Sequence, residues 1–543
     1  MRRQDGRFEQ AMIFGGEKRT GAIAAVVSAI VVGAPVLAVL ASLTGPYGDT
    51  IAHVAATVGA DYLVNTAILC FAVGAASAIL GGGAAFLAAV CDFPLRRFFA
   101  LALIFPLATP AYIAAYAYAD LLGPFGALAP LAGFAQSVGL PPIKSLAGAA
   151  FVLSLTLFPY VYLTARAAFA AQSSAMLETA RTLGARPLKA ALVLLAPMAR
   201  PAIAGGAALA MMETAAEFGV ADYFGVSTLS VGVFRTWHSF GDLTAASQVA
   251  SALFIFSLSL VAFESITRRG RTSEAPRVSR APMRIRLNGF AAAGAVLFCA
   301  ILVCGGFFVP AIAIAAKLDP SLWPVASRNL GATAANSFSI AAAGVVSAIA
   351  LSLLLAYAGR QTANSALKAL IRIATLGYAV PGTVIAIGVL ATFSTLRETI
   401  GPAAFLGGGA AALIYAYSVR FLTAGYNAAS AGLDKIDKGY DAAAKTLGAG
   451  ASRILATIHA PLLRRAVFAG ATIVFVDIIK ELPATLILRD FNFETLATRV
   501  YRLAGDERLA EAAPEALILI GVGAIPILIF HVLSEMRGSS IAK

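Results

Sequence analysis

Long apolar stretches separated by short polar segments dominate the hydrophobic pattern of this chain. A helix needs roughly 20 mostly apolar residues to cross a bilayer. Twelve stretches approach that length, at about residues 21–43, 63–90, 98–122, 146–168, 201–220, 246–267, 288–316, 337–358, 369–394, 403–428, 466–487 and 514–534. Several contain internal Gly or Pro, which neighbouring helices tolerate in a membrane. The pattern predicts an all-α polytopic membrane protein with about twelve transmembrane helices.

Composition agrees with this pattern and excludes a water-soluble chain. Apolar residues make up 59% and charged residues 13% of the 543 positions, against a usual charged fraction of roughly a quarter. The four cysteines lie in or beside apolar stretches without CxxC spacing. They are interpreted as small hydrophobic residues, not as a disulfide framework or a metal site. The stretch at 21–43 is too long for a cleaved signal sequence and is expected to remain as the first span.

The distribution of positive charge predicts the orientation. Most of the 41 Lys and Arg residues fall in segments that are cytoplasmic if the N-terminus is cytoplasmic. By the positive-inside rule, both termini are therefore expected in the cytoplasm. The same bias explains most of the net charge of +13, so no nucleic-acid partner is expected. The basic stretch 268–287 is interpreted as a cytoplasmic linker, with a solvated linker and a lipid-headgroup contact both left open.

An internal duplication divides the chain. Residues 178–197 and 442–461 share Thr-Leu-Gly and Ala-Pro in the same register, 264 residues apart. Further matched pairs are Asn65 with Asn336, Pro110 with Pro381, Glu213 with Asp477, and Glu217 with Glu481. A duplication of this length indicates two copies of one structural unit.

The repeat predicts a four-part organisation. The expected parts are an N-terminal cytoplasmic segment (1–20), a first transmembrane domain (21–267), the linker (268–287) and a second transmembrane domain (288–543). Because both domains start on the same side, they are expected to be parallel six-helix repeats with a pathway between them.

The duplicated segments are expected to be helix–break–helix loops. In the first copy, Gly184 can take the left-handed conformation that ends a helix, Pro187 suits the next first turn, and Pro197 is expected to stop that helix. Such a rigid element could transmit force from a partner to the adjoining spans. An ordinary amphipathic loop is the alternative, and two copies at matching positions argue against it.

These loops resemble the signature of permease subunits of bacterial binding-protein-dependent ABC importers. The signature reads Glu-Ala-Ala, three residues, Gly, nine residues, Ile-x-Leu-Pro. In its register lie Glu178, Ala180, Gly184, Leu194 and Pro197 of the first copy, and Ala443, Ala444, Gly448, Ile458 and Pro461 of the second. The second copy departs from the signature, because Ala442 occupies the acidic position and Asp441 comes one residue early.

The resemblance implies partners and a location. It implies that both loops are coupling helices for two copies of an ABC ATPase, that a periplasmic binding protein delivers the solute, and that the chain lies in the bacterial inner membrane. Residues 212–226 and 480–513 are similar to fused ferric-iron importer permeases in particular. Iron is therefore the expected solute, with thiamine and phosphonate-type solutes as alternatives within the same architecture.

Four acidic residues are expected inside the membrane. Glu213 and Glu217 share one helix face, and Asp477 and Glu481 repeat them in the second half. A charge at the bilayer centre costs at least ~2.5–3.5 kcal/mol. The carboxylates could line the pathway, with Glu217 and Glu481 as oxygen ligands for the hard ferric ion. Alternatively, they pair locally and hold helices in register, and both interpretations stay open.

No catalytic constellation is found in the sequence. Residues 15–20 only superficially resemble a phosphate-binding loop. The chain is therefore expected to be a transport subunit that binds no cofactor, while ATP and Mg²⁺ are used by the partner ATPase. An ion-coupled secondary transporter with two six-helix repeats is the rival class. The duplicated loop argues against it, because a secondary carrier has no partner to dock there.

Overall fold

The computed structural model describes residues 23–182, 191–268, 284–362, 364–375, 377, 380–401 and 409–541. Most of these residues are helical, which confirms the predicted all-α class. Within the described ranges, the extended structure is one parallel pair, β1 (Cys91–Asp92) and β2 (Ile285–Arg286). The predicted segment 1–20 and most of the linker 268–287 lie outside the described residues.

Eight described helices are long and apolar enough to cross a membrane, which confirms a polytopic membrane protein. They span Ile23–Thr44, Asp49–Val90, Leu146–Ala171, Val193–Ala216, Leu243–Ile266, Gly289–Ala315, Ser327–Gln361 and Leu509–Ile529. The predicted stretches 369–394, 403–428 and 466–487 are largely helical where described but are not among the eight. The count of twelve spans stays a prediction.

The predicted span 98–122 is a bent pair instead of one straight helix. Arg96–Ala108 and Ala111–Leu122 meet at 90°, and they form a ninth span if the pair crosses the membrane together. Pro106 and Pro110 lack the N–H donors that a continuous helix needs, and Pro110 takes an extended ψ of 133°. Pro381 has a ψ of 146° and precedes α17 in the same way, so 369–394 is also interrupted.

Packing divides the chain into two compact units. One unit, here called the 334–495 unit, consists of Met1–Pro46, Gly241–Ser251 and Ala334–Thr495. The other, here called the 47–240 unit, consists of Tyr47–Phe240, Ala252–Thr333 and Leu496–Lys543. Each unit contains segments from both sides of the linker. The units therefore do not coincide with the predicted domains 21–267 and 288–543. Those domain boundaries, which follow the internal duplication of the sequence, stay a prediction.

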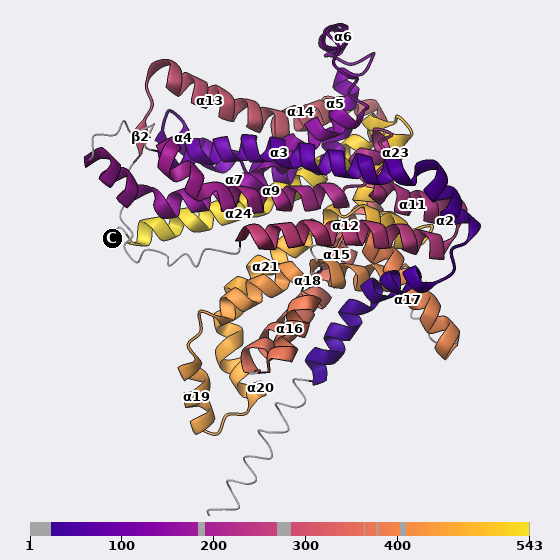
Figure 1. Cartoon of the computed structure of the whole chain (residues 1–543), viewed down its shortest axis with the longest axis vertical. Coiled ribbons are helices and arrows are strands. Elements are labelled where there is room, and N and C mark those ends of the chain that lie inside the picture. The colour runs from indigo at the N-terminus through magenta and orange to yellow at the C-terminus, as the bar shows by residue number, and fades with distance from the viewer. Residues whose placement is uncertain are drawn as a thin grey trace, which may run out of the picture. The chain divides into compact units, whose positions relative to one another are not determined.

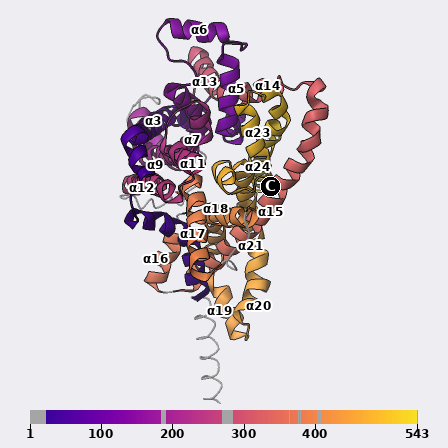
Figure 2. The ribbon, with the colours of Figure 1, turned by 90° about the vertical axis from the view of Figure 1, so that its right-hand side faces the viewer.

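The 47–240 unit is built around three long helices, α3, α7 and α9 (Figure 1). A side chain on Gly81 would overlap the backbone of α7 at Phe158 and Tyr162, so this glycine permits a close helix crossing. Tyr118 donates a hydrogen bond of 2.6 Å to the Gly305 carbonyl. The α-helices of the unit are α2 (Asp49–Val54), α3 (Ala60–Val90), α4 (Arg96–Ala102), α5 (Ala111–Leu122), α6 (Ala129–Ser137), α7 (Leu146–Thr182), α9 (Ala196–Ala216), α10 (Gly219–Tyr223), α11 (Leu229–Phe240), most of α12 (Leu243–Arg268), α13 (Gly289–Val303), α14 (Val309–Ala315), α23 (Leu496–Gly505) and α24 (Leu509–Ile541). The short helix α6 lies beyond one end of α5 (Figure 2).

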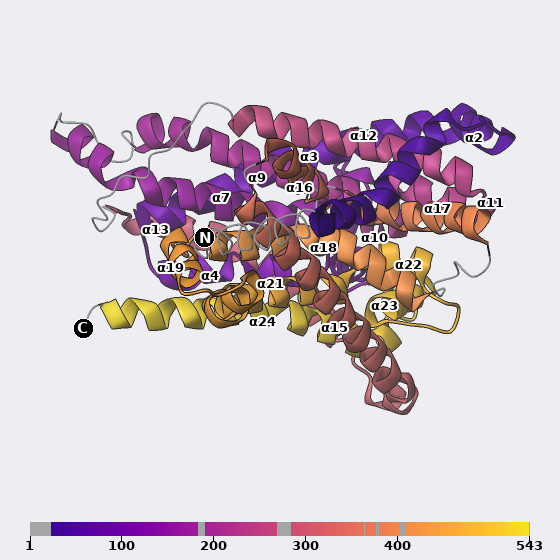
Figure 3. The same cartoon turned by 90° about the horizontal axis from the view of Figure 1, so that it is seen from below.

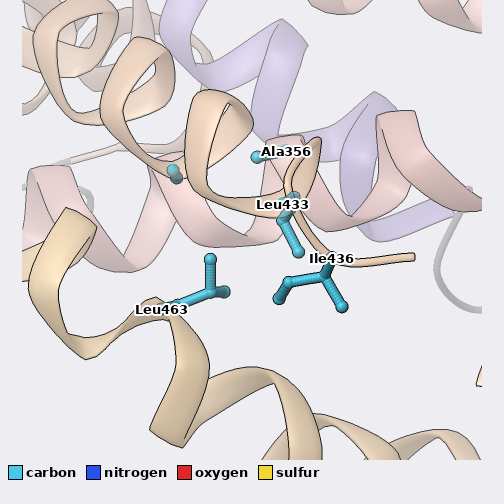
Figure 4. Close-up of a cluster of buried hydrophobic side chains, with 5 residues drawn as sticks. Ala356, Leu433, Ile436 and Leu463 are labelled. Atoms are coloured by element: carbon cyan, nitrogen blue, oxygen red, sulfur yellow. The ribbon is translucent and has the colours of Figure 1, made fainter. Parts of the chain in front are cut away.

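The 334–495 unit includes the first span, Ile23–Thr44. The Tyr415 hydroxyl donates to the Val31 carbonyl, and Ser251 donates to the Val39 carbonyl at 2.8 Å. The remaining α-helices are most of the long α15 (Trp323–Gln361; Figure 3), α16 (Ser365–Ala374), α17 (Gly382–Ile400), α18 (Ala410–Leu433), α19 (Lys438–Thr446), α20 (Ala451–Ile454), α21 (Ala460–Lys480) and α22 (Pro483–Leu488). Figure 4 shows a buried apolar cluster of Ala356, Ala429, Leu433, Ile436 and Leu463 that joins α15, α18 and α21.

Local structure repeats along with the sequence. α9 and α21 each contain 21 residues and start 264 residues apart. Each follows a five-residue π-helical turn, Ala191–Leu195 or Leu455–His459, and each leads into a short helix, α10 or α22. The matched asparagines make the same bond. Asn65 donates to the Ser227 carbonyl and Asn336 to the Glu494 carbonyl, both at 3.0 Å.

Candidate functional site: membrane carboxylates and the cytoplasmic loops

Glu217 and Glu481 occupy equivalent breaks in two helices. Glu217 follows α9 with a ψ of 124°, and Glu481 follows α21 with a ψ of 123°, so both residues leave the helical conformation. Each side chain then accepts a hydrogen bond of 3.1 Å from a backbone N–H three residues later, at Val220 or Ala484. Each carboxylate thus satisfies a first-turn N–H of the next helix from the residue just before its N-cap, Phe218 or Leu482. Both glutamates therefore fix a helix–break–helix turn.

In the 334–495 unit, Glu481 is also half of a buried ion pair. Arg420 of α18 places Nη1 2.9 Å from Glu481 Oε1, and the side chains are 16% and 1% exposed. Thr485 donates to Glu481 Oε2 through its backbone N–H at 3.0 Å and its hydroxyl at 2.9 Å. The Tyr417 hydroxyl lies 2.6 Å from the Thr485 hydroxyl. Hydrogen bonds therefore surround this buried carboxylate, which offsets its loss of solvation.

Gly382 makes room for this ion pair. A Cβ at this position, the first residue of α17, would overlap the Arg420 guanidinium and approach Glu481 Oε1 to 2.6 Å. Backbone and charged groups can approach closely here because glycine has no side chain. The break before α17 is thus shaped around the Arg420–Glu481 pair.

In the 47–240 unit, Glu217 has a different setting. Its side chain is partly exposed, as is that of Glu213 one turn earlier. The residue that follows it, Phe218, is buried and lies 5.7 Å from Tyr501 between ring centroids. The repeat thus conserves the break and its hydrogen bond, while the exposure of the carboxylate differs between the copies.

The described residues contain no group of three or more His, Cys, Asp or Glu placed to hold a metal ion. The suggested ferric ligands Glu217 and Glu481 belong to different compact units, and Asp477 is partly exposed on α21. Their role as pathway or metal ligands stays a prediction. Glu481 joins α21 to α18 through Arg420, whereas the contact of Glu217 with Val220 lies within its own helix break.

The second duplicated loop forms the predicted helix–break–helix. α19 ends at Thr446, Gly448 takes a left-handed φ of +81°, and α20 begins at Ala451. Asp437 caps α19 by accepting from the Gly439 N–H at 2.6 Å. Gly448 therefore has the conformation that was expected of its counterpart Gly184, which a residue with a side chain adopts only at a cost.

Asp441 anchors α19 to the rest of its unit. Its carboxylate accepts from Arg360 of α15 at 3.2 Å and shares a hydrogen bond of 2.7 Å with the buried His459. Arg360 also donates to the Leu433 and Ile436 carbonyls at 2.6 and 3.0 Å. The early acidic residue of the second copy thus joins the ends of α15, α18 and α21 to the loop.

The first loop is described only in part. Glu178 and Ala180 lie near the end of the α7 backbone, and Gly184 lies outside the described residues. Pro197 sits in the first turn of α9, as Pro461 does in α21, and each helix runs directly on from its π-helical turn. The expectation that Pro197 stops a helix was therefore wrong, because the backbone stays helical through it, directly after the π-helical turn Ala191–Leu195.

Comparison with known proteins identifies the type of chain. Residues 348–534 match the family described as "Binding-protein-dependent transport system inner membrane component". The Fe(3+)-transport system permease protein FbpB 2 of Haemophilus influenzae is 24% identical over 86% of this chain and 89% of its own length. The chain is an ABC importer permease. The putative 2-aminoethylphosphonate transport system permease protein PhnU of Salmonella typhimurium is 28% identical over 36% of this chain and 71% of its own. A second Haemophilus influenzae protein, the putative ferric transport system permease protein FbpB 1, is 24% identical over 74% of this chain and 65% of its own.

Membership in this class confirms a multi-pass membrane permease of a binding-protein-dependent system, which works with an ATPase and a solute-binding protein. The second half of the permease carries the family match, and the duplicated local structure extends the architecture to the first half.

Sequence reasoning missed the partner of Glu481. Local pairing was left open, whereas the ion pair is formed by Arg420, 61 residues away. A signal was present, because Arg420 is the single charged residue in the predicted span 403–428 of the permease. An isolated arginine in an apolar span generally requires a buried acidic partner.

Replacing Asp441 with Ala is expected to uncouple α19 from the permease core. The change leaves the Arg360 guanidinium and His459 without a shared carboxylate, which costs about 1–3 kcal/mol. We expect earlier thermal unfolding of the purified permease and weaker binding of its ATPase subunit. Asp434→Ala, an exposed acidic residue shortly before α19, is the matched control. Equal behaviour of the two variants would show that Asp441 does not position the loop.

Proposed function

We propose that this permease imports ferric iron delivered by a periplasmic binding protein. The observation that carries the proposal is similarity across 86% of the chain, through both halves, to an Fe(3+)-transport permease. The carboxylates on α9 and α21 are consistent with a hard cation, which prefers oxygen ligands.

The remaining parts of the mechanism belong to the same proposal. The loops around 178–197 and 442–461 receive two copies of the ATPase, and closure of the ATPase dimer drives the solute pathway between inward- and outward-facing states. Both termini lie in the cytoplasm, on the side of the ATPase. Asp441, held by Arg360 and His459, keeps the second loop in a fixed orientation for that contact.

A phosphonate-type solute is the second candidate. It is supported by the 28% identity to the 2-aminoethylphosphonate permease, over 36% of this chain. Thiamine remains an alternative within the same architecture. Transport of an anionic solute would not require the negative charge of Glu217, whereas transport of a ferric ion would.

The test is ATP hydrolysis by the lipid-reconstituted permease with its ATPase, measured with the binding protein in iron-loaded and iron-free forms. We expect the iron-loaded form alone to stimulate hydrolysis. Gly448→Val should remove the stimulation, since its φ of +81° disfavours a side chain, while Gly33→Val is the control because a Cβ there meets no neighbour within 4 Å. Assembly with the ATPase but no response to iron would overturn the solute, and phosphonate and thiamine would be tested next. Failure of the ATPase to associate would favour the secondary-transporter class.

A further inference from the structure

An arginine cluster lies where three membrane helices of the 47–240 unit end. The spans Asp49–Val90 and Gly289–Ala315 terminate here, and the bent pair begins at Arg96. α3, α4 and α13 contact one another at this end, beside β2 (Figure 1). The position marks a membrane–water boundary, because two long apolar helices change to polar sequence at the same level.

The parallel β pair brings the end of the linker to this boundary. Cys91 pairs with Ile285 and Asp92 with Arg286, and the Leu287 N–H donates to the Asp92 carbonyl at 2.9 Å. Arg284 and Arg286 therefore lie at the ends of the spans, fixed by backbone bonds that do not depend on their side chains. Both side chains are exposed.

Positive charge accumulates around this pair. Arg96 contacts Asp92 at 3.3 Å and donates to the Ala88 carbonyl at 3.2 Å. Partial loss of solvation lowers the pKa of Arg284, and the charges of Arg96, Arg97 and Arg166 lower it further, while Asp92 acts in the opposite direction. Arg166 of α7 lies at the same end, since it donates to the Ala100 carbonyl of α4 at 2.8 Å, and Asp92 is the carboxylate paired with Arg96.

The sequence offers little to neutralise this cluster from within the linker. Residues 268–287 hold seven arginines and one acidic residue, Glu274. Guanidinium groups pair with phosphate through two parallel hydrogen bonds, which makes arginine suited to this ligand. The cluster, here called the boundary arginine cluster, consists of Arg96, Arg97, Arg166, Arg284 and Arg286.

Apolar side chains surround the cluster and point outward. Leu95 is 64% exposed, Phe98 54% and Phe290 98%. Exposed apolar groups next to phosphate-binding arginines match a ligand with a charged head and hydrocarbon chains. Aromatic residues at this level are also typical of membrane interfaces.

We propose that the boundary arginine cluster binds the phosphate headgroup of an anionic phospholipid, whose acyl chains cover Phe98 and Phe290. The linker is then held on the membrane surface at its C-terminal end by the β pair and the lipid together. A free phosphate ion offers the same headgroup chemistry but leaves the exposed apolar rim uncovered. Basic sites between membrane helices commonly recognise anionic headgroups.

The test is lipid retention by the purified full-length permease, titrated with phosphatidylglycerol or phosphatidylcholine and followed by native mass spectrometry. The double variant Arg284→Gln/Arg286→Gln is expected to bind phosphatidylglycerol about 30-fold more weakly, since each arginine near the surface contributes ~1 kcal/mol and ~1.4 kcal/mol is tenfold. Arg464→Gln/Arg465→Gln removes the same charge from exposed positions on α21 and is expected to leave binding close to wild type.

Three outcomes would overturn the proposal. Equal weakening in both double variants would mean non-specific attraction to net charge. Unchanged binding in Arg284→Gln/Arg286→Gln and also in Arg97→Gln/Arg284→Gln would remove the cluster as the site. Displacement of the lipid by inorganic phosphate at matched ionic strength would indicate a small-anion site, because a phospholipid that also uses the apolar rim resists such competition.

Discussion

Replacing Arg420 with Ala is expected to destabilise the permease by about 3–5 kcal/mol, among the largest effects of any single change in the 334–495 unit. The substitution leaves the Glu481 carboxylate, whose side chain is 1% exposed, without its cationic partner. The cost arises from a buried, uncompensated charge more than from the lost attraction itself. Denaturant titration of the detergent-purified permease, followed by loss of helical circular dichroism, measures the effect.

A paired substitution separates these two causes. Arg420→Met with Glu481→Gln removes both charges, and Gln retains an acceptor for the Ala484 N–H. We expect this double variant to recover most of the lost stability, because an apolar replacement of a buried ion pair is often neutral. Equal destabilisation by the single and the double change would contradict the assignment of the Arg420–Glu481 pair as the source.

Neutralising Glu217 and Glu481 together is expected to lower iron uptake by at least about tenfold, equivalent to ~1.4 kcal/mol in the transport barrier. Glutamine keeps the shape and the acceptor for the first-turn N–H at each helix break, so the turns remain formed once Arg420 is replaced as well. A ferric ion needs anionic oxygen ligands, whereas a helix cap needs only an acceptor. Uptake of radiolabelled iron into proteoliposomes or cells measures the difference.

The variant must be designed around Arg420. Glu481→Gln alone leaves the Arg420 guanidinium without an anionic partner. Glu217→Gln is therefore combined with Arg420→Met and Glu481→Gln. The control is the double variant Arg420→Met/Glu481→Gln. ATPase binding should persist in both. If uptake is unchanged, these glutamates are not pathway ligands. Their hydrogen bonds at the helix breaks then explain why both halves of the repeat carry them.

The duplicated loop and the helix breaks show which structural features local sequence can predict. The left-handed conformation that was predicted for Gly184 is found at its counterpart Gly448, because glycine adopts positive φ without a penalty. Asn65 and Asn336, identified in the sequence only as a matched pair of the repeat, make equivalent hydrogen bonds. The prolines were harder to interpret. Pro197 starts a helix that it was expected to precede, and Pro110 breaks a span that was expected to be continuous.

The sequence by itself determined the all-α membrane class, most helix positions and the repeat, because hydrophobic length, Gly and Pro act on the backbone over a few neighbouring residues. Only the tertiary structure decided that Arg420 neutralises Glu481, that Asp441 joins Arg360 to His459, and that the first span packs with the 334–495 unit. These pairings join residues 18 to several hundred positions apart. In a chain that is 59% apolar, many helices offer similar faces. Specific partners are therefore selected by close packing at glycines and by the high cost of leaving a buried charge unpaired.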